Sequence, residues 1–245
     1  MNTKIKKLNI DVRKSIDENI YSSNKKIKEI FKFTLDIICQ NYPENINSIL
    51  DVGCSNGSFL KFLKTKFPNA NLVGLDVSKK LLCVAEKNVK NGKFINGSIE
   101  DKSCLGKNKY DLITMFGVIG ILKDPKKSII NSVSRLNKGG RLYISSNFNE
   151  NNIDVIMKYR RSDIKKAQWE EGWNIFSIHT ISNILSKISK VERFTFYDFL
   201  MPFDIKKTDD PMRAWTTRVG NKSRYQINGA EQLLNRKVLE IKIKN

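Results

Sequence analysis

Residues 48–63 read SILDVGCSNGSFLKFL, and this stretch decides the fold. A short apolar run leads into a turn that has glycine at positions 53 and 57, and a helix-like pattern follows the turn. A glycine-rich turn between a strand and a helix is typical of loops that hold a nucleotide-like ligand. The same residues also match G-x-S-x-G, the turn that carries the nucleophile of serine hydrolases. The two interpretations predict different enzymes.

The hydrolase interpretation makes Ser55 a nucleophile and requires an acid and then a histidine later in the chain. His179 does follow Ser55 in the chain. However, the turn comes after the first predicted strand, and no HGGG-like oxyanion loop precedes it. The ligand-binding interpretation is therefore favoured, with Ser55 as a small residue that lets the backbone approach a ligand.

Strand-like and helix-like segments alternate from residue 48 onward. The pattern predicts strands over 48–53, 71–76, 93–98, from 110, and over 141–148, and helices over 24–42, 57–67, 78–92 and 124–140. Such alternation is typical of a parallel sheet with right-handed crossovers. Beyond residue 150 we expect a helix and an aromatic-rich loop over 151–177, a helix over 180–188, a strand over 191–199, a hairpin across Gly220-Asn221 and a final edge strand over 236–244.

Two carboxylates indicate what the glycine loop binds. Asp51 lies two residues before Gly53, where it would repel a pyrophosphate but would suit a ligand that carries an ammonium group. Asp76 ends the next strand, 19 residues after Gly57, where an acid accepts hydrogen bonds from both hydroxyls of a ribose. A ribose joined to a cationic amino-acid end describes S-adenosylmethionine.

Several motifs together resemble class I S-adenosylmethionine-dependent methyltransferases of the small-molecule type. ILDVGCSNGSFL resembles the first motif of that family, and NLVGLDVSKKLLCVAEKN resembles the acidic-loop motif that follows it. FINGSIED, YDLITMFGVIGILKDP and LNKGGRLYISS resemble the later motifs in order and spacing. The resemblance covers about residues 46–150. It implies an α/β, Rossmann-like, doubly wound and mostly parallel seven-stranded sheet with an antiparallel C-terminal strand.

The resemblance also implies roles for individual residues in holding S-adenosylmethionine. Asp51 would reach the methionine ammonium, and the backbone from Gly53 through Cys54 and Ser55 to Gly57 would line the methionine portion. Asp76 would bind the ribose, and Val77 would pack on the adenine. The remaining cofactor positions that it implies are Ser98, Ile99, Met115, Phe116 and Tyr21. No metal site is expected.

The sequence departs from the family pattern at two places. Ser98 stands where many members have an aspartate for the adenine edge, and Gly120-Ile121 stands where many have a histidine pair. His179 is the side chain whose ordinary pKa makes it a ready base near neutral pH, so we consider it as the catalytic base. The alternative is an exposed histidine beside a helix cap at Thr180 or Ser182.

Two segments after residue 150 are candidates for the acceptor site. We expect an N-terminal helical cap segment over 1–45 and a methyltransferase domain over 46–245, with substrate-binding insertions at about 151–178 and 201–232. Aromatic rings and planar cations in the insertions suit a sugar, a base or a phosphate. The candidate residues are Tyr159, Arg160, Trp169, Trp173, Arg213 and Trp215. A solvated amphipathic helix would explain the first insertion equally well.

Composition places limits on location and partners. The formal net charge is +19, but the lysines are spread along the chain, which is also typical of a lysine-rich compositional bias. Four cysteines show no metal-ligand spacing, which favours a reducing cytoplasm. The N-terminal residues contain no apolar signal segment, and the apolar run from Leu112 to Leu122 is too short to span a membrane.

We therefore expect a cytoplasmic methyltransferase that uses S-adenosylmethionine to methylate a hydroxyl, or an amine, of a small, polar, anionic acceptor. KYRRSDIKKAQWEEGWNIFS and TDDPMRAWTTR resemble segments of methyltransferases associated with bacterial surface-polysaccharide biosynthesis. That resemblance implies a nucleotide-activated sugar or another capsule or O-antigen precursor as the acceptor. Two alternatives stay open. One is an RNA or DNA methyltransferase, which the net charge suggests and the missing Asn-Pro-Pro-Tyr-like tetrad disfavours. The other is a non-catalytic protein that binds the cofactor and acts as a scaffold.

Overall fold

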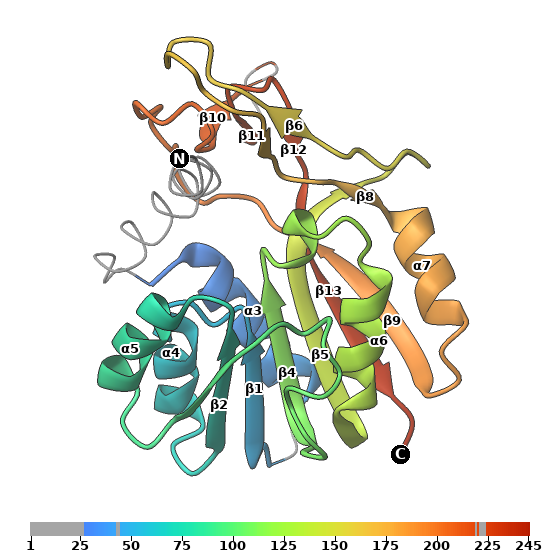
Figure 1. Ribbon diagram of the computed structural model, residues 1–245. Coiled ribbons are helices and arrows are strands. Elements are labelled where there is room, and N and C mark those ends of the chain that lie inside the picture. Colours follow the sequence, from blue (N-terminus) through green and yellow to red (C-terminus); the bar gives the residue numbers. More distant parts are fainter. Residues whose placement is uncertain (1–26, 43–44, 219, 221–223) are drawn as a thin grey trace, which may run out of the picture.

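One twisted sheet forms the centre of the computed structural model, which describes residues 27–42, 45–218, 220 and 224–245 (Figure 1). Its strands follow the order β3-β2-β1-β4-β5-β13-β9. Their bounds are Lys93–Asn96 (β3), Asn71–Asp76 (β2), Ser48–Val52 (β1), Tyr110–Phe116 (β4), Leu136–Asn149 (β5), Arg236–Ile243 (β13) and Val191–Asp198 (β9). A short strand, β8 (Phe176–Ser177), pairs with β5 outside this path.

The pairing confirms the predicted strand directions. Strands β1 to β5 pair in parallel, and β13 runs antiparallel to both β5 and β9. The chain adds β2 and then β3 on one side of β1, and it adds β4 and then β5 on the other side. The strand order therefore reverses between β1 and β4. In open parallel sheets the crevice at this point, outside the carboxyl ends of the strands, is where ligands bind.

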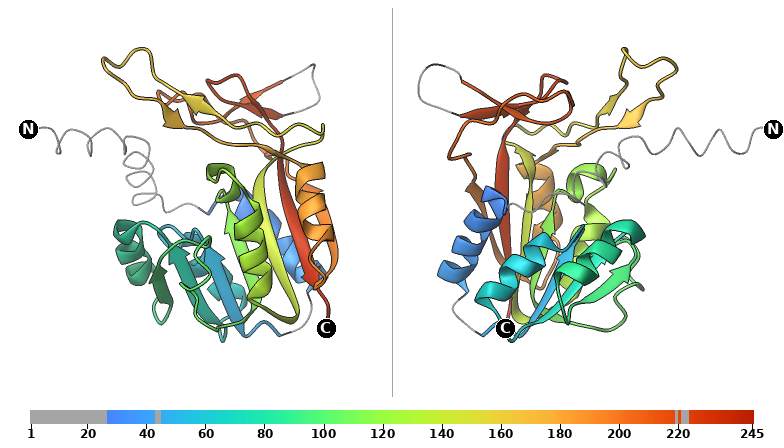
Figure 2. Two further views of the ribbon diagram at one scale, coloured as in Figure 1. Left: turned by 45° about the vertical axis from the view of Figure 1, so that its right-hand side comes forward. Right: turned by 90° about the vertical axis from the view of Figure 1, so that its left-hand side faces the viewer.

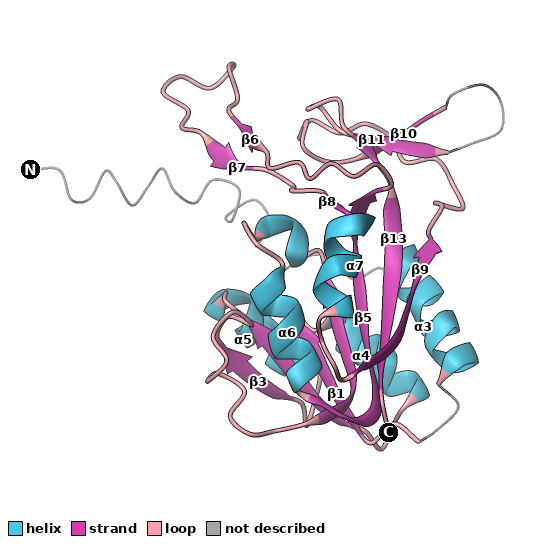
Figure 3. Cartoon of the chain, turned by 90° about the vertical axis from the view of Figure 1, so that its right-hand side faces the viewer, coloured by secondary structure: helices cyan, strands magenta, loops and turns pink. Residues whose placement is uncertain are grey.

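Helices cover both faces of the sheet (Figure 3). One face carries α3 (Glu29–Asn41), α4 (Ser58–Lys66) and α5 (Lys79–Asn88), and the other carries α6 (Lys126–Ser134) and α7 (Ile178–Ser186). A 3-10 turn, η1 (Ile119–Ile121), follows β4. The apolar stripes that predicted the helices point at the sheet and form one core on each face. Within the described part of the chain, no helix is both long enough and apolar enough to cross a membrane.

Both predicted insertions lie beyond the carboxyl ends of the parallel strands (Figures 1 and 2). The first contains the pair β6 (Lys158–Tyr159) and β7 (Glu170–Glu171). The second contains β10 (Trp215–Thr217), β11 (Tyr225–Ile227) and β12 (Leu233–Leu234). Antiparallel pairing of β10 with β11 confirms the hairpin predicted across Gly220. The insertions therefore stand over the same end of the sheet as the crevice.

The predicted helix in the first insertion is wrong. Ile153 and Ile156 have helical spacing, but they are 61% and 52% exposed. The residues that face inward alternate instead, because Val155 pairs with Ile175 and Met157 is buried. A period of two is the pattern of a strand, and the segment is extended. Likewise, the helix predicted over 124–140 ends at Ser134, and the next strand already begins at Leu136.

The prediction that the last strand lies at the sheet edge is also wrong, because β13 lies between β5 and β9. The alternation of charged and apolar residues resembled a half-solvated edge strand. The structure buries those charges: Lys237 pairs with Glu150 and Asp198, and Glu240 pairs with Arg141. The strands at the two ends of this order are β3 and β9.

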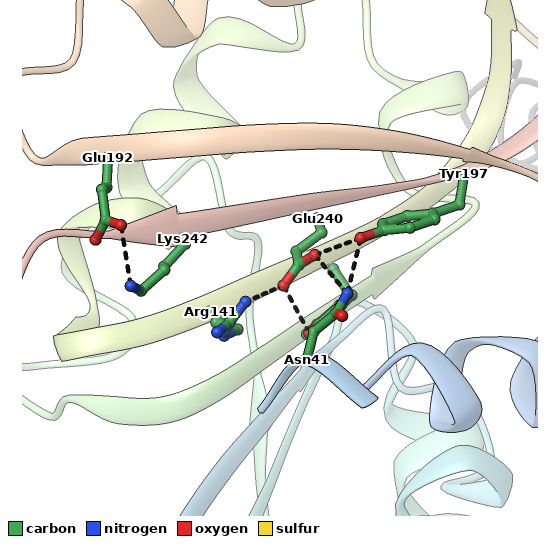
Figure 4. A network of polar contacts seen from close by, with 7 residues as sticks. Asn41, Arg141, Glu192, Tyr197, Glu240 and Lys242 are labelled. Carbon is green, nitrogen blue, oxygen red and sulfur yellow. Dashed lines mark hydrogen bonds and ion pairs between the residues drawn. The ribbon is translucent and has the colours of Figure 1, made fainter. Parts of the chain in front are cut away.

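A buried polar network joins helix α3 to the sheet (Figure 4). The Glu240 carboxylate, on β13, bonds to the Arg141 guanidinium and accepts from the Tyr143 hydroxyl at 3.1 Å. The Asn41 amide, at the end of α3, donates to Glu240 at 3.0 Å, and the Tyr197 hydroxyl of β9 donates at 2.9 Å. Each carboxylate oxygen of Glu240 thus accepts from two donors. A buried charge needs such partners to offset the loss of its contacts with water.

We expect the substitution Glu240→Ala to lower the free energy of unfolding by about 3–5 kcal/mol, because it leaves the Arg141 guanidinium buried without its partner. The measurement is urea unfolding followed by circular dichroism. Glu192→Ala is the matched control, since it removes the Glu192–Lys242 ion pair on the same part of the sheet, where both side chains reach solvent. That variant should lose no more than about 1 kcal/mol. Equal losses in the two variants would contradict the role given to the network.

Candidate functional site

The loop between β1 and α4 has a backbone shape that few residues adopt. Gly53, Ser55 and Gly57 have φ values of 71°, 51° and 74°. The amides of Gly53 and Cys54 both donate to the Leu75 carbonyl of β2, at 2.7 and 3.1 Å. A Cβ atom on Gly53 would lie 2.4 Å from Cγ2 of Val118, so only glycine allows this approach to the loop after β4.

Asp76, at the carboxyl end of β2, organises the loop. Its carboxylate accepts a hydrogen bond from the backbone amide of Ser55 at 2.8 Å and from that of Ser78 at 2.8 Å. Ser78 then caps α5 by accepting from the amide of Leu81. One acid therefore connects the loop after β1 with the first turn of the helix after β2.

Asp51 is a buried acid at the end of β1, with 3% of its surface exposed. It accepts a hydrogen bond from the Thr114 hydroxyl of β4 at 2.7 Å. Burial raises the pKa of Asp51 to about 7; the Thr114 hydrogen bond opposes this rise, the Asp76 carboxylate adds to it, and the Lys28 ammonium opposes it. A site that holds two carboxylates in this way is suited to a ligand with a positive charge.

A cavity of about 470 Å³ opens beside these acids. Most residues predicted to hold the cofactor line it: Asp51, Gly53, Cys54, Ser55, Asp76, Val77, Ser98, Ile99 and Phe116. Gly57 and Met115 are not among the lining residues. Gly57 lies against Ala85 of α5 and against Val89, which follows that helix, and Met115 is fully buried in the core on the α6 face. Tyr21 lies outside the described residues.

The lining residues that sequence reasoning missed are mostly apolar. Phe31 of α3, Phe59 of α4 and Phe116 of β4 form an aromatic cluster, with ring centroids 4.6 to 5.4 Å apart. Lys28 precedes α3 and also lines the cavity. Val118, Ile121 and Leu122 line it from the turn after β4. The inward stripe of each helix predicted the burial of Phe31 and Phe59, but no local signal shows that they meet over the end of β4.

Cys54 and Ser55 are the side chains of the loop that could act as nucleophiles. Neither is activated in this structure. Burial raises the pKa of the Cys54 thiol, so the thiol stays protonated near neutral pH. The Ser55 hydroxyl is buried and has no hydrogen-bond partner among the described residues. A serine nucleophile requires a base within hydrogen-bond reach, so the hydrolase interpretation has no support here.

Of the six predicted acceptor residues, Trp173 is the one found among the lining residues of the cavity. Tyr159 and Trp169 belong to the β6–β7 region, where Tyr159 bonds to Glu170 and Arg160 stacks on Trp169. In the second insertion, Arg213 pairs with Asp210, and Lys207 lies over the Trp215 ring. These side chains stand in the two insertions rather than at the cavity wall.

His179 lies on the exposed side of α7, away from the lining residues. Its Nε2 is 2.8 Å from the side-chain nitrogen (Nδ2) of Asn183, one helical turn later. The structure thus places the histidine beside the helix cap at Ser177, which accepts from the amide of Thr180. In the part of the chain that the structure describes, no group of three metal-ligating side chains comes together.

Comparisons with known proteins show the family to which the chain belongs. A family model described as "Methyltransferase domain" matches residues 44–194. The malonyl-[acyl-carrier protein] O-methyltransferase of Halalkalibacterium halodurans is 35% identical over 40% of this chain and 38% of its own. The demethylmenaquinone methyltransferase of Thermotoga maritima is 30% identical over 46% of this chain and 48% of its own. The chain therefore spans less than half the length of these curated relatives.

Solved structures share the fold over nearly the whole chain. The plantazolicin methyltransferase BpumL, in complex with a monoazolic desmethylPZN analog and SAH, has a TM-score of 0.58 at 15% identity, covering 97% of this chain and 94% of its own. An S-adenosylmethionine-dependent methyltransferase from Clostridium acetobutylicum has a TM-score of 0.57 at 16% identity, covering 99% and 98%. At such identities the likeness shows the fold alone.

We expect Asp51→Asn to stabilise the unliganded protein at neutral and alkaline pH. Because the folded pKa of Asp51 is raised from 3.8 to about 7, folding becomes less favourable as the pH rises between these values. Asparagine carries no charge and keeps an oxygen for the Thr114 hydroxyl. The gain in thermal midpoint should therefore be near zero around pH 4 and largest above pH 7. A gain that is the same at pH 5 and pH 8 would contradict the raised pKa.

Proposed function

Because the chain belongs to the methyltransferase domain family, we propose that it transfers a methyl group from S-adenosylmethionine to a small-molecule acceptor. One observation carries the proposal: the acids at the ends of the neighbouring strands β1 and β2 flank a glycine loop at the point where the strand order reverses. A ligand with a cationic amino-acid end and a ribose matches the positions of Asp51 and Asp76.

The residues of the site fit this donor. Asp51 is a buried acid whose pKa is raised by burial, and an ammonium group would offset the cost of its charge. The backbone from Gly53 to Ser55 lines the cavity, where it could approach the methionine portion of the donor. Asp76 would bind the ribose hydroxyls, while Val77, Ser98 and Ile99 would hold the adenine. The sulfonium of the donor supplies an activated methyl group.

The residues of this chain would contribute to methyl transfer mainly by holding the donor and the acceptor in the right relative orientation. Methyl transfer is an in-line displacement, and orientation of two reactants supplies up to about 7–11 kcal/mol of the barrier. Asp51 and Asp76 lie at the β1–β2 side of the cavity, so the wall formed by Phe116, Ile121 and Trp173 is where the methyl end of the donor and the acceptor would meet. Apolar side chains in this wall would exclude water from the reacting atoms, which would strengthen the electrostatic attraction between an anionic acceptor and a cationic donor.

For the acceptor, we propose a hydroxyl of a small anionic molecule such as a nucleotide-activated sugar or a capsule precursor. The net charge of +19 supports an anionic partner, and Trp173 offers a ring for stacking. The arginines of the second insertion give less support than the sequence suggested, because Arg213 pairs with Asp210, and Arg218 pairs with Asp204. A reducing cytoplasm remains part of the proposal, and the free thiols of the described cysteines are consistent with it.

Isothermal titration with S-adenosylhomocysteine tests donor binding. Asp76→Ala should weaken binding about 10- to 100-fold, because it removes the acceptor of the ribose hydroxyls and loosens the amide of Ser55. The control is Asp163→Ala, which removes an exposed acid paired with Arg161 in the first insertion. Unchanged affinity in Asp76→Ala would contradict the placement of the ribose.

A methyl-transfer screen tests the acceptor. It compares sugar nucleotides with simple alcohols and amines. Tight binding of the cofactor without turnover on any of them would favour the scaffold alternative.

We expect His179→Ala to retain turnover on any acceptor that the screen identifies, with an unchanged pH profile, because the imidazole contacts Asn183 rather than the cavity. The measurement is kcat/KM between pH 6 and pH 9. A loss of more than about 100-fold, the usual size of a general-base effect, would restore His179 as the base.

A further inference from the structure

Asn174 is a buried side chain that joins the first insertion to the wall of the cavity. It is 2% exposed. Its Nδ2 donates to the Leu122 carbonyl at 2.8 Å, and its Oδ1 accepts from the amide of Met157 at 3.0 Å. Its backbone amide donates to the Gly120 carbonyl at 2.7 Å. A buried amide that is bonded in this way is held rigidly, because each lost bond would leave a buried group unsatisfied.

The partners of Asn174 belong to two different parts of the molecule. Gly120 and Leu122 belong to the turn after β4, and Ile121 and Leu122 line the donor cavity. Met157 belongs to the first insertion, next to β6. The side chain therefore bridges a segment that lines the cavity and the first insertion.

The neighbour of Asn174 in the chain is Trp173, which itself lines the cavity. The approach of this segment to the turn is close. A Cβ atom on Gly120 would lie 3.3 Å from the Asn174 carbonyl oxygen and 3.8 Å from Cε3 of Trp173. The hydrogen bonds of Asn174 thus set the position at which the indole meets the cavity.

The base of the first insertion is fixed, whereas its tip is exposed. Asp154 accepts from the Ser177 amide at 2.6 Å and from the Thr180 hydroxyl at 2.7 Å, and Val155 pairs with Ile175. At the tip, Trp169 is 66% exposed and Ile164 is 43% exposed. An exposed tip on a fixed base is a region whose local order can change while the rest of the fold stays intact.

We propose that Asn174 is a positioning residue that couples occupancy of the donor cavity to the order of the first insertion. The proposal rests on the proposed function in one respect, that the donor fills this cavity. A bound donor contacts the turn at 118–122 and Trp173, and Asn174 holds both against Met157, so ordering of the wall also orders the insertion. By linkage, an acceptor bound at the insertion then raises the affinity for the donor by the same factor.

The test is hydrogen exchange of the full chain with and without S-adenosylhomocysteine. In the wild type, the ligand should slow exchange of the amides over 153–177 by about fivefold or more, the lower end of typical coupling between sites. In Asn174→Ala, the ligand should bind with an affinity within about threefold of the wild type, yet this slowing should be lost. A merely structural role would loosen the insertion equally with and without the ligand.

Asn183→Ala, which removes an exposed amide of α7 that contacts His179, is the matched control and should keep the slowing. The wild-type measurement decides the matter even if Asn174→Ala fails to fold. If S-adenosylhomocysteine binds and the amides over 153–177 exchange at unchanged rates, the coupling is wrong and the proposed function stands. If titration shows no binding, the proposed function fails and the coupling fails with it.

Discussion

The whole site depends on the two hydrogen bonds that Asp76 accepts from the amides of Ser55 and Ser78. They draw the loop after β1 across the end of β2 and set the start of α5. The left-handed φ of Ser55 is unfavourable for a residue with a side chain, and the hydrogen bond from its own amide helps to hold it there. Without this acid, the bonds from Gly53 and Cys54 to the Leu75 carbonyl would still hold the start of the loop on β2, but the amide of Ser55 and the start of α5 would lose their shared partner.

Asp51 adds an unfavourable feature next to this stable one. The fold places a carboxylate where burial disfavours its charge, and the Thr114 hydroxyl offsets only part of that cost. Stability alone would favour a neutral side chain at this position. Such a conflict between folding and local chemistry is typical of binding sites, where the ligand supplies the missing charge.

The sequence predicted the part of the fold whose signals are local. Alternating strands and helices, the glycine turn and the spacing from Gly57 to Asp76 all lie within short stretches, and the structure agrees with them. The place of β13 could not be predicted in this way. Its Glu240 is satisfied by Arg141, 99 residues away, so a strand that looked half-solvated is an interior one.

In the candidate site, too, the features with local sequence signals were predictable and those that depend on distant contacts were not. Residues on the loops after β1 and β2 were predictable, because the carboxyl ends of parallel strands meet at one edge of a sheet. Residue type alone could not show which aromatic or basic side chain of the insertions reaches the cavity. Trp173 and Trp169 look alike in the sequence, yet one lines the cavity and the other is exposed.

What separates the two tryptophans is the neighbouring Asn174, whose bonds to Gly120, Leu122 and Met157 draw that end of the insertion inward. His179 illustrates the opposite case. Histidine is a common catalytic base, but the place of His179 on α7 next to Asn183 leaves it outside the lining of the cavity. In this site, hydrogen bonds decide which apolar side chains line the cavity. The residue that makes those bonds, here Asn174, need not be reactive itself.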